Sequence, residues 1–282
     1  MKNLILFASA LLILLFTACE EEKEDFDACH CGTVMKNKSN SNAPVLGFYE
    51  TYKSKELGEF LNSVILDSNH FQIDSIQTNE NDFVHSSEFL QKFRVNIGND
   101  NRFVDDPQLG FALGEDTSRI NEILSFHIEG NWFEVDKIKF AWSKKIKNFL
   151  SKDGDYYSLY ALKLDAGDQA RFSSKGVESA QHYIDPRDNE VSITVIMNEE
   201  GTQKWSQMTL ENIGNYIAMV SGDKVLSAPV IMAPITGGQT RISGGLIESE
   251  AQDLVDLINC EAHKRELGKA AFLEEMAGCS ND

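Results

Sequence analysis

The stretch VSITVIMNEEGTQKW, residues 191–205, decides how the second half of the chain folds. Positions 191–197 are mostly β-branched or otherwise apolar, which is typical of a buried strand. Asn198 can cap a helix running from Glu199 to about Met208, and the carboxylates of its first turn suit a helix N-terminus. The stretch therefore predicts a strand that leads directly into a helix.

Strand and turn signals continue on both sides of this unit. Residues 156–163 (YYSLYALK) are rich in aromatic and aliphatic side chains and predict another strand. Two apolar runs, 216–220 and 225–231, are separated by Ser221-Gly222-Asp223-Lys224, which indicates a hairpin. A short strand is expected over 240–243, before Gly244-Gly245.

Three further segments carry apolar residues at helical spacing, over 55–66, 116–126 and 248–259. The expected buried faces are Leu57, Phe60, Leu61, Val64 and Ile65; Ile120, Ile123 and Leu124; and Ala251, Leu254, Val255 and Ile258. Residues 71–95 show several short strand signals without clear boundaries. Because strands and helices mix without regular βαβ repetition, the predicted class is α+β, with a mixed or antiparallel sheet packed with helices.

Residues 1–18 have the anatomy of a secretory signal, with Lys2 followed by an apolar run that is short for a membrane span. Thr17-Ala18-Cys19 resembles the lipobox of bacterial lipoproteins. That resemblance implies removal of the signal and lipidation of Cys19, with palmitate among the acyl groups. The alternative is an ordinary signal peptide followed by an unrelated cysteine.

Residues 19–44 are expected to form an acidic and polar tether. The acidic run Glu20–Asp25 can keep the chain extended and hold the domain clear of a bilayer. It also resembles the acidic signals that follow the lipid cysteine in surface-exposed lipoproteins of Bacteroidota-type bacteria. The expected location is the outer membrane of a bacterial envelope, on its periplasmic side or at the cell surface.

The net charge of the chain argues against two classes of binding partner. The chain has 44 acidic and 26 basic residues, a formal charge of -18. This balance argues against nucleic acid, which needs a basic footprint, and against electrostatic docking on anionic lipid.

Four cysteines follow Cys19, namely Cys29, Cys31, Cys260 and Cys279. In an exported chain they favour disulfides over metal ligation or free thiols. The spacing Cys29-His30-Cys31 is a poor match to structural zinc sites, whose paired cysteines lie two to four residues apart. We expect links from the N-terminal arm to Cys260 and Cys279, which would tie the tether to the C-terminal helix.

No pattern in the sequence indicates catalysis. The six histidines share no helical face at ligand spacing, and neither G-x-S-x-G nor H-E-x-x-H occurs. The glycine-rich run 235–245 lacks the Gly-Lys-Ser/Thr of a phosphate-binding loop. We therefore expect no catalytic residues, no metal, no cofactor and no small-molecule substrate.

From Met197 the chain resembles a known family. The residues concerned are Met197-Asn198-x-x-Gly201-x-x-x-Trp205, Thr209-x-x-Asn212-x-Gly214, Ile217-Ala218-x-Val220, Ser227-Ala228-Pro229, Gly237-Gly238 and Ile242-Ser243-Gly244. This pattern is similar to the periplasmic head region of the protein-export subunit SecD, especially the fused SecDF form of Bacteroidota. The similarity is specific between about 135 and 258.

The resemblance implies the fold of that head and an ability to hold an emerging unfolded chain without catalysis. Two departures from the family pattern limit which properties of the family can be expected of this chain. The turn reads Gly222-Asp223 where the family favours Asp-Gly, and Asn259-Cys260 with a soluble tail replaces the segment that enters the family's membrane bundle. Proton-driven transport draws on intramembrane charged residues, which this chain has no bundle to hold.

Five residues are candidates for contact with such a chain. Trp205, Met208 and Met219 are adaptable apolar groups, and Gly237 and Gly238 flank a loop that could act as a clamp lip. A strand edge could also accept a peptide by β-augmentation. The alternative for the three large side chains is an ordinary core position, and for the glycines an ordinary turn.

The expected organisation is a signal peptide (1–18), a tether (19–44), an α+β region of uncertain fold (45–130), a SecD-head-like domain (131–259) and a C-terminal helical tail (260–282). The expected function is that of a lipid-anchored, noncatalytic envelope protein that binds polypeptide or a partner protein as an export accessory. The alternative is an interaction lipoprotein that keeps the fold without an export role.

Overall fold

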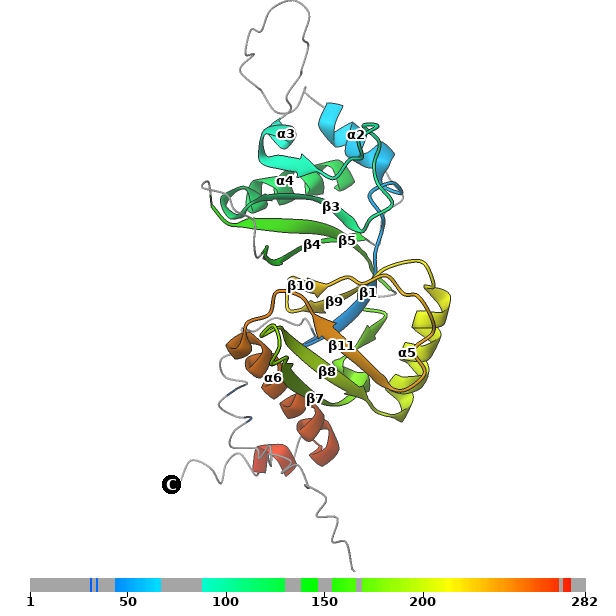
Figure 1. The fold of residues 1–282 in the computed structure, drawn as a ribbon, viewed down its shortest axis with the longest axis vertical. Coiled ribbons are helices and arrows are strands. Elements are labelled where there is room, and N and C mark those ends of the chain that lie inside the picture. The colour runs from blue at the N-terminus through cyan, green and yellow to red at the C-terminus, as the bar shows by residue number, and fades with distance from the viewer. Residues whose placement is uncertain are drawn as a thin grey trace, which may run out of the picture.

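The computed structural model describes Cys31, Val34 and residues 44–66, 88–129, 138–146, 154–165, 169–268 and 271–274 (Figure 1). Strands and helices mix in an α+β arrangement built on a large mixed sheet, which confirms the predicted class. In the described part of the chain, the strands form an eight-stranded sheet and a three-stranded sheet.

One hydrophobic core lies where three helices cover one part of the large sheet, in the upper half of Figure 1. Its elements are α2 (Gly58–Leu66), α3 (Glu88–Lys92), α4 (Thr117–Glu129), β2 (Phe93–Val95), β3 (Gln108–Leu113), β4 (Ile138–Lys145) and β5 (Tyr156–Lys163), with the 3₁₀ turn η1 (Gly114–Asp116) before α4. The predicted helix faces are confirmed, since Phe60, Leu61 and Val64 of α2 and Ile120, Ile123 and Leu124 of α4 are buried there.

A second core fills the lower half of the molecule (Figure 1). The antiparallel strands β7 (Val177–Ile184), β8 (Val191–Met197) and β11 (Gln239–Ser243) form the small sheet, in the order β11-β8-β7. Helices α5 (Glu199–Glu211) and α6 (Glu248–Leu267) pack against this core. The predicted buried face of α6 is confirmed, and the helix continues beyond the expected end at Asn259 to Leu267.

The large sheet connects the two cores. Its order is β2-β3-β5-β4-β10-β9-β1-β6, in which β1 (Gly47–Glu50) pairs with β9 (Ile217–Ser221) and with β6 (Phe172–Ser173). Directly after β1, Thr51 bridges to Leu162 at the end of β5. A third cluster, which includes Tyr49, Leu162 and Val220, lies at this junction.

These pairings divide the chain differently from the expected boundary at residues 130 and 131. Strand β1 belongs to the core of α5 and α6, whereas β4 and β5 pack under α2, α3 and α4. The difference arises because β1 finds its partners far along the chain, and apolar periodicity carries no information on strand partners.

The predicted hairpin is confirmed by β9 and β10 (Lys224–Ser227), joined through Gly222 and Asp223. Gly222 has φ +61°, a conformation that suits glycine in a tight hairpin turn. The apolar run continues past β10, where Ile231 pairs with Ile213 and Val230 pairs with Tyr216.

The strand-to-helix unit 191–205 is held by a close contact between two glycines. Asn198 caps α5 as predicted, because its side-chain oxygen accepts a hydrogen bond of 2.8 Å from the amide of Gly201. The amide of Asn198 donates to the carbonyl of Gly176, at the end of the 3₁₀ turn η2 (Ser174–Gly176). A Cβ on Gly201 would lie 1.9 Å from that carbonyl oxygen.

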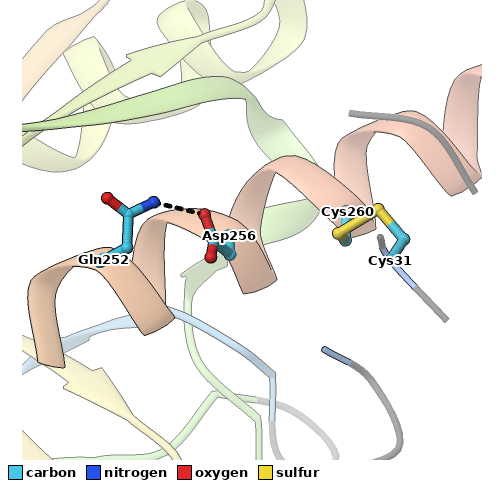
Figure 2. Close-up of a disulfide and its surroundings, with 4 residues drawn as sticks. All are labelled: Cys31, Gln252, Asp256 and Cys260. Carbon is cyan, nitrogen blue, oxygen red and sulfur yellow. Dashed lines mark hydrogen bonds between the residues drawn. A yellow bond between two sulfur atoms is a disulfide. The ribbon is translucent and has the colours of Figure 1, made fainter. Parts of the chain in front are cut away.

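A fourth, small apolar cluster joins the N-terminal arm to α6. Cys31 and Cys260 form a disulfide (Figure 2). Phe272 and Val34 pack with them in a separate apolar cluster. On the same helix, Asp256 lies one turn before Cys260 and Gln252 lies two turns before it. The side-chain amide of Gln252 donates a hydrogen bond to the carboxylate of Asp256 (Figure 2). The expected partners Cys29 and Cys279 lie outside the described residues.

We predict that Gly201→Ala destabilises the fold by about 2–4 kcal/mol, because the added methyl group meets backbone atoms that cannot move away cheaply. Gly237→Ala is the matched control, since no atom lies within 4 Å of a Cβ at that position. Urea unfolding followed by circular dichroism measures both. Equal midpoints for the two variants would contradict the role of this contact.

Removal of the disulfide should lower the free energy of unfolding by about 2–5 kcal/mol, because it cross-links residues 229 positions apart. Cys31→Ala, Cys260→Ala and the double variant should lose the same amount, since each removes the same bond. Peptide mapping under non-reducing conditions should yield a Cys31–Cys260 peptide, and Cys29→Ala should leave that peptide intact. Additive losses, or a different cysteine pair, would contradict this assignment.

Candidate functional site

The structure buries the three large side chains that the sequence offers as binding residues. Trp205 is fully buried, with its ring 4.9 Å from that of Phe48 and 6.1 Å from that of Phe172. Met208 and Met219 belong to the same core. The structure therefore favours the core interpretation, because helix α5 turns Trp205 and Met208 inward and leaves them no surface for a partner.

The indole of Trp205 carries one unusual feature. Its Nε1 is buried, and no described residue accepts a hydrogen bond from it. An unpaired donor in an apolar core costs about 1–3 kcal/mol. The tryptophan at this position is therefore explained by the packing of its rings and not by a hydrogen bond.

The part of the β10–β11 loop that leads into β11 is held against α5 and β8. The amide of Ile235 donates to the hydroxyl of Thr209 at 2.9 Å, and the carbonyl of Gly238 accepts from the amide of Met197 at 2.8 Å. Gly238 has φ +68°, and a Cβ there would lie 2.6 Å from the Thr202 hydroxyl. Gly238 thus serves close packing and a turn, while Gly237 is exposed.

The first part of the same loop exposes apolar side chains. Met232 is 80% exposed and Val230 is 40% exposed, while Ile231 between them is buried. Ile231 pairs with Ile213, which is 49% exposed, and Leu210 lies one turn earlier on α5. We call Leu210, Ile213, Val230 and Met232 the apolar edge.

Glu211, which lies between Leu210 and Ile213 in the sequence, belongs to a group of paired charges. Arg171 binds both Glu50 and Glu211, and the side chain of Asn212 donates to Glu50 at 3.2 Å. Burial opposes the charged form of Arg171, but the hydrogen bonds that it donates to Glu50 and Glu211 raise its pKa overall. The pKa of Glu211 is lowered by hydrogen bonds from Gln207 and Arg171, so this carboxylate stays ionised.

Lys53 connects the two halves of the molecule. Its ammonium group lies 3.1 Å from the carboxylate of Asp105 and 3.5 Å from the carbonyl oxygen of Gly214. The hydroxyl of Tyr216 donates to the carbonyl of Asp105 at 3.4 Å. The carboxylate of Asp105 is therefore held close to the segment that carries Ile213.

No group of three His, Cys, Asp or Glu side chains within the described ranges is placed to hold a metal ion. Across the same part of the chain, no helix combines the length and the apolar character needed to span a bilayer. Cys19, the expected lipid site, lies outside the described residues.

Sequence reasoning missed the apolar edge. The run 225–231 is apolar at nearly every position, so alternation could not show which side chains face outward. Leu210 and Ile213 follow the buried Met208 and Thr209 and carry no signal that separates them from the core face of α5. The exposure of Ile213, Val230 and Met232 is a property of the folded chain, in which Ile213 pairs with the buried Ile231.

Residues 156–262 match the family model described as SecDF, P1 head subdomain. The SecD protein translocase subunit of Acetobacter pasteurianus is 36% identical over 84 residues, which cover 30% of this chain and 16% of that protein. The SecD subunit of Rhodothermus marinus is 28% identical over 153 residues, covering 54% of this chain and 24% of that protein. The chain thus spans about a quarter or less of these relatives.

Solved structures are also similar. The crystal structure of SecDF in its super-membrane-facing form has a TM-score of 0.32 and 20% identity, covering 54% of this chain and 21% of that chain. A structure of SecDF, described as a membrane component that enhances protein export, has a TM-score of 0.32 and 16% identity, covering 77% and 93%. These TM-scores are too low to support an argument of their own.

The family match includes the motif residues from Met197 to Gly244 on which the resemblance rests. In the structure these residues lie on β8, α5, β9, β10 and β11 or in the segments between them. The predicted resemblance is confirmed. Residues 156–262 are a domain like the periplasmic head of SecD.

Proposed function

We propose that this chain is a noncatalytic protein of the bacterial cell envelope that binds unfolded polypeptide as an accessory to protein export. The observation that carries the proposal is the match of residues 156–262 to the SecDF head subdomain. The relatives that share this region are named as protein translocase subunits. What this region offers is a folded binding surface, in keeping with a role that needs no chemical step.

The proposal includes a lipid anchor at Cys19, supported by the signal-like residues 1–18 and the lipobox resemblance at Thr17-Ala18-Cys19. The Cys31–Cys260 disulfide would then attach the tether to α6 rather than leave it joined to the fold only at β1. The proposed location is the outer membrane, and protease treatment of intact cells separates the surface from the periplasmic side.

A second candidate is an interaction lipoprotein that keeps the head fold without an export role. It is favoured by the limits of the family match, which covers residues 156–262 and leaves helices α2, α3 and α4 outside it. The two candidates differ in their partner, which is an unfolded client or translocon in the first and one folded protein in the second.

We predict that the protein takes up labelled palmitate in growing cells and that Cys19→Ser abolishes the label. Wild-type protein should sediment with membranes, whereas Cys19→Ser should remain in the soluble fraction or keep its uncleaved signal. Cys29→Ser is the matched control and should be labelled as the wild type is. Absence of label in the wild type, with membrane binding unchanged in Cys19→Ser, would contradict the anchor.

Crosslinking in cells followed by purification of the full chain should recover translocon subunits or newly exported, unfolded clients. Pulse-labelled polypeptides should appear in the complex early and leave it as they fold, because a holding protein binds exposed apolar segments. Recovery of a single folded partner, with neither clients nor translocon subunits, would contradict the export role and support the second candidate.

A further inference from the structure

We infer that the apolar edge binds an extended polypeptide segment by adding it as a strand next to residues 229–232. This inference rests on the proposed function and assigns that function a site. The edge consists of the exposed side chains of Val230 and Met232, with Ile213 paired to the intervening Ile231 and Leu210 three residues before Ile213.

The backbone of residues 229–232 has one paired side. The carbonyl of Ile231 accepts from the amide of Gly214 at 2.8 Å, and the amide of Ile231 donates to the carbonyl of Asn215 at 2.8 Å. The carbonyl of Pro229 accepts from the amide of Ile217 at 3.3 Å. Alternate residues of this segment therefore direct their polar groups toward residues 213–217.

The backbone groups of Val230 and Met232 lie on the opposite, unpaired side of this segment. Successive residues of an extended chain point their amide and carbonyl groups in opposite directions, so those of Val230 and Met232 point away from residues 213–217. No residue in the described ranges forms a backbone hydrogen bond with either of them. Unpaired backbone groups next to exposed apolar side chains form a template for another strand.

The side chains fit an apolar segment. Met232 is the most exposed large apolar side chain among the described residues, and its flexible thioether adapts to different partners. Ile213, which pairs with Ile231, and Leu210 near the end of α5 add two more exposed apolar side chains. Backbone pairing with adaptable side chains suits a partner of variable sequence, as an unfolded client would be.

Exposed carboxylates near the apolar edge favour basic segments among apolar ones, although Arg171 already pairs with Glu211 and Lys53 with Asp105. Glu211 directly follows Leu210 in the sequence, and Lys53 holds Asp105 near Gly214; the side chains of Glu211 and Asp105 are 40% and 68% exposed. The whole chain carries a charge of -18. A segment in which apolar residues alternate with lysine can place one face on the apolar edge and direct its ammonium groups toward these carboxylates.

The test measures the affinity of the full chain, purified in detergent, for a fluorescent peptide of alternating valine and lysine. Met232→Asp should weaken binding about tenfold, because it removes an apolar contact and adds a like charge to an acidic surface. Leu66→Asp is the matched control, since Leu66 is 76% exposed and lies on α2 in the other half of the molecule (Figure 1). It should change the affinity less than twofold.

Peptides with methylated backbone nitrogens test the strand addition without altering the protein. Methylation of alternate residues on one edge should weaken binding at least fivefold, and methylation of the other edge should leave it nearly unchanged, because only one edge of an added strand pairs. Equal effects of the two peptides would overturn the inference.

The outcomes separate the site from the function. If the wild type binds the peptide and Met232→Asp binds equally well, the site is overturned while the proposed function stands. If the wild type binds neither this peptide nor a reduced and alkylated unfolded protein, both fail. A dimer that depends on Met232, seen by sedimentation in the absence of peptide, would also overturn the inference because a second copy would then occupy the edge.

Discussion

The close approach of Gly176 and Gly201 is the constraint on which the lower half of the molecule depends. It brings the start of α5 against the 3₁₀ turn before β7, with the amide of Asn198 bound to the Gly176 carbonyl. Any side chain at residue 201 would hold the helix away from this turn. With the helix docked, Trp205 enters the core between Phe48 and Phe172, and Thr209 is placed to accept from the amide of Ile235.

This constraint extends to the surface through the loop after β10. Ile235 and Gly238 fix the far end of the loop on α5 and β8, while the hairpin of β9 and β10 fixes its beginning. Between these attachments, the pairing of Ile231 with Ile213 turns Ile231 inward and leaves Val230 and Met232 outside. The exposed edge is therefore a consequence of a well-packed framework.

Much of the fold could be predicted from the sequence because its signals are local. The period of apolar residues gave the faces of α2, α4 and α6, and the sequence Asn-Glu-Glu-Gly gave the cap of α5. Long-range choices carry no such signal. The pairing of β1 with β9 and the selection of Cys31 as the partner of Cys260 depend on the folded chain. The candidate site was predicted less well, since Trp205, Met208 and Met219 are buried and the exposed Met232 lies in a run without alternation.

The central claim is that an extended polypeptide pairs with the backbone at residues 229–232. Hydrogen–deuterium exchange of the full chain, with and without the alternating valine–lysine peptide, measures this at the amides concerned. The account predicts that the amides of Val230 and Met232, which donate to no described backbone group, exchange more slowly when the peptide is bound. Unchanged exchange at these two amides, with protection elsewhere or nowhere, would contradict it.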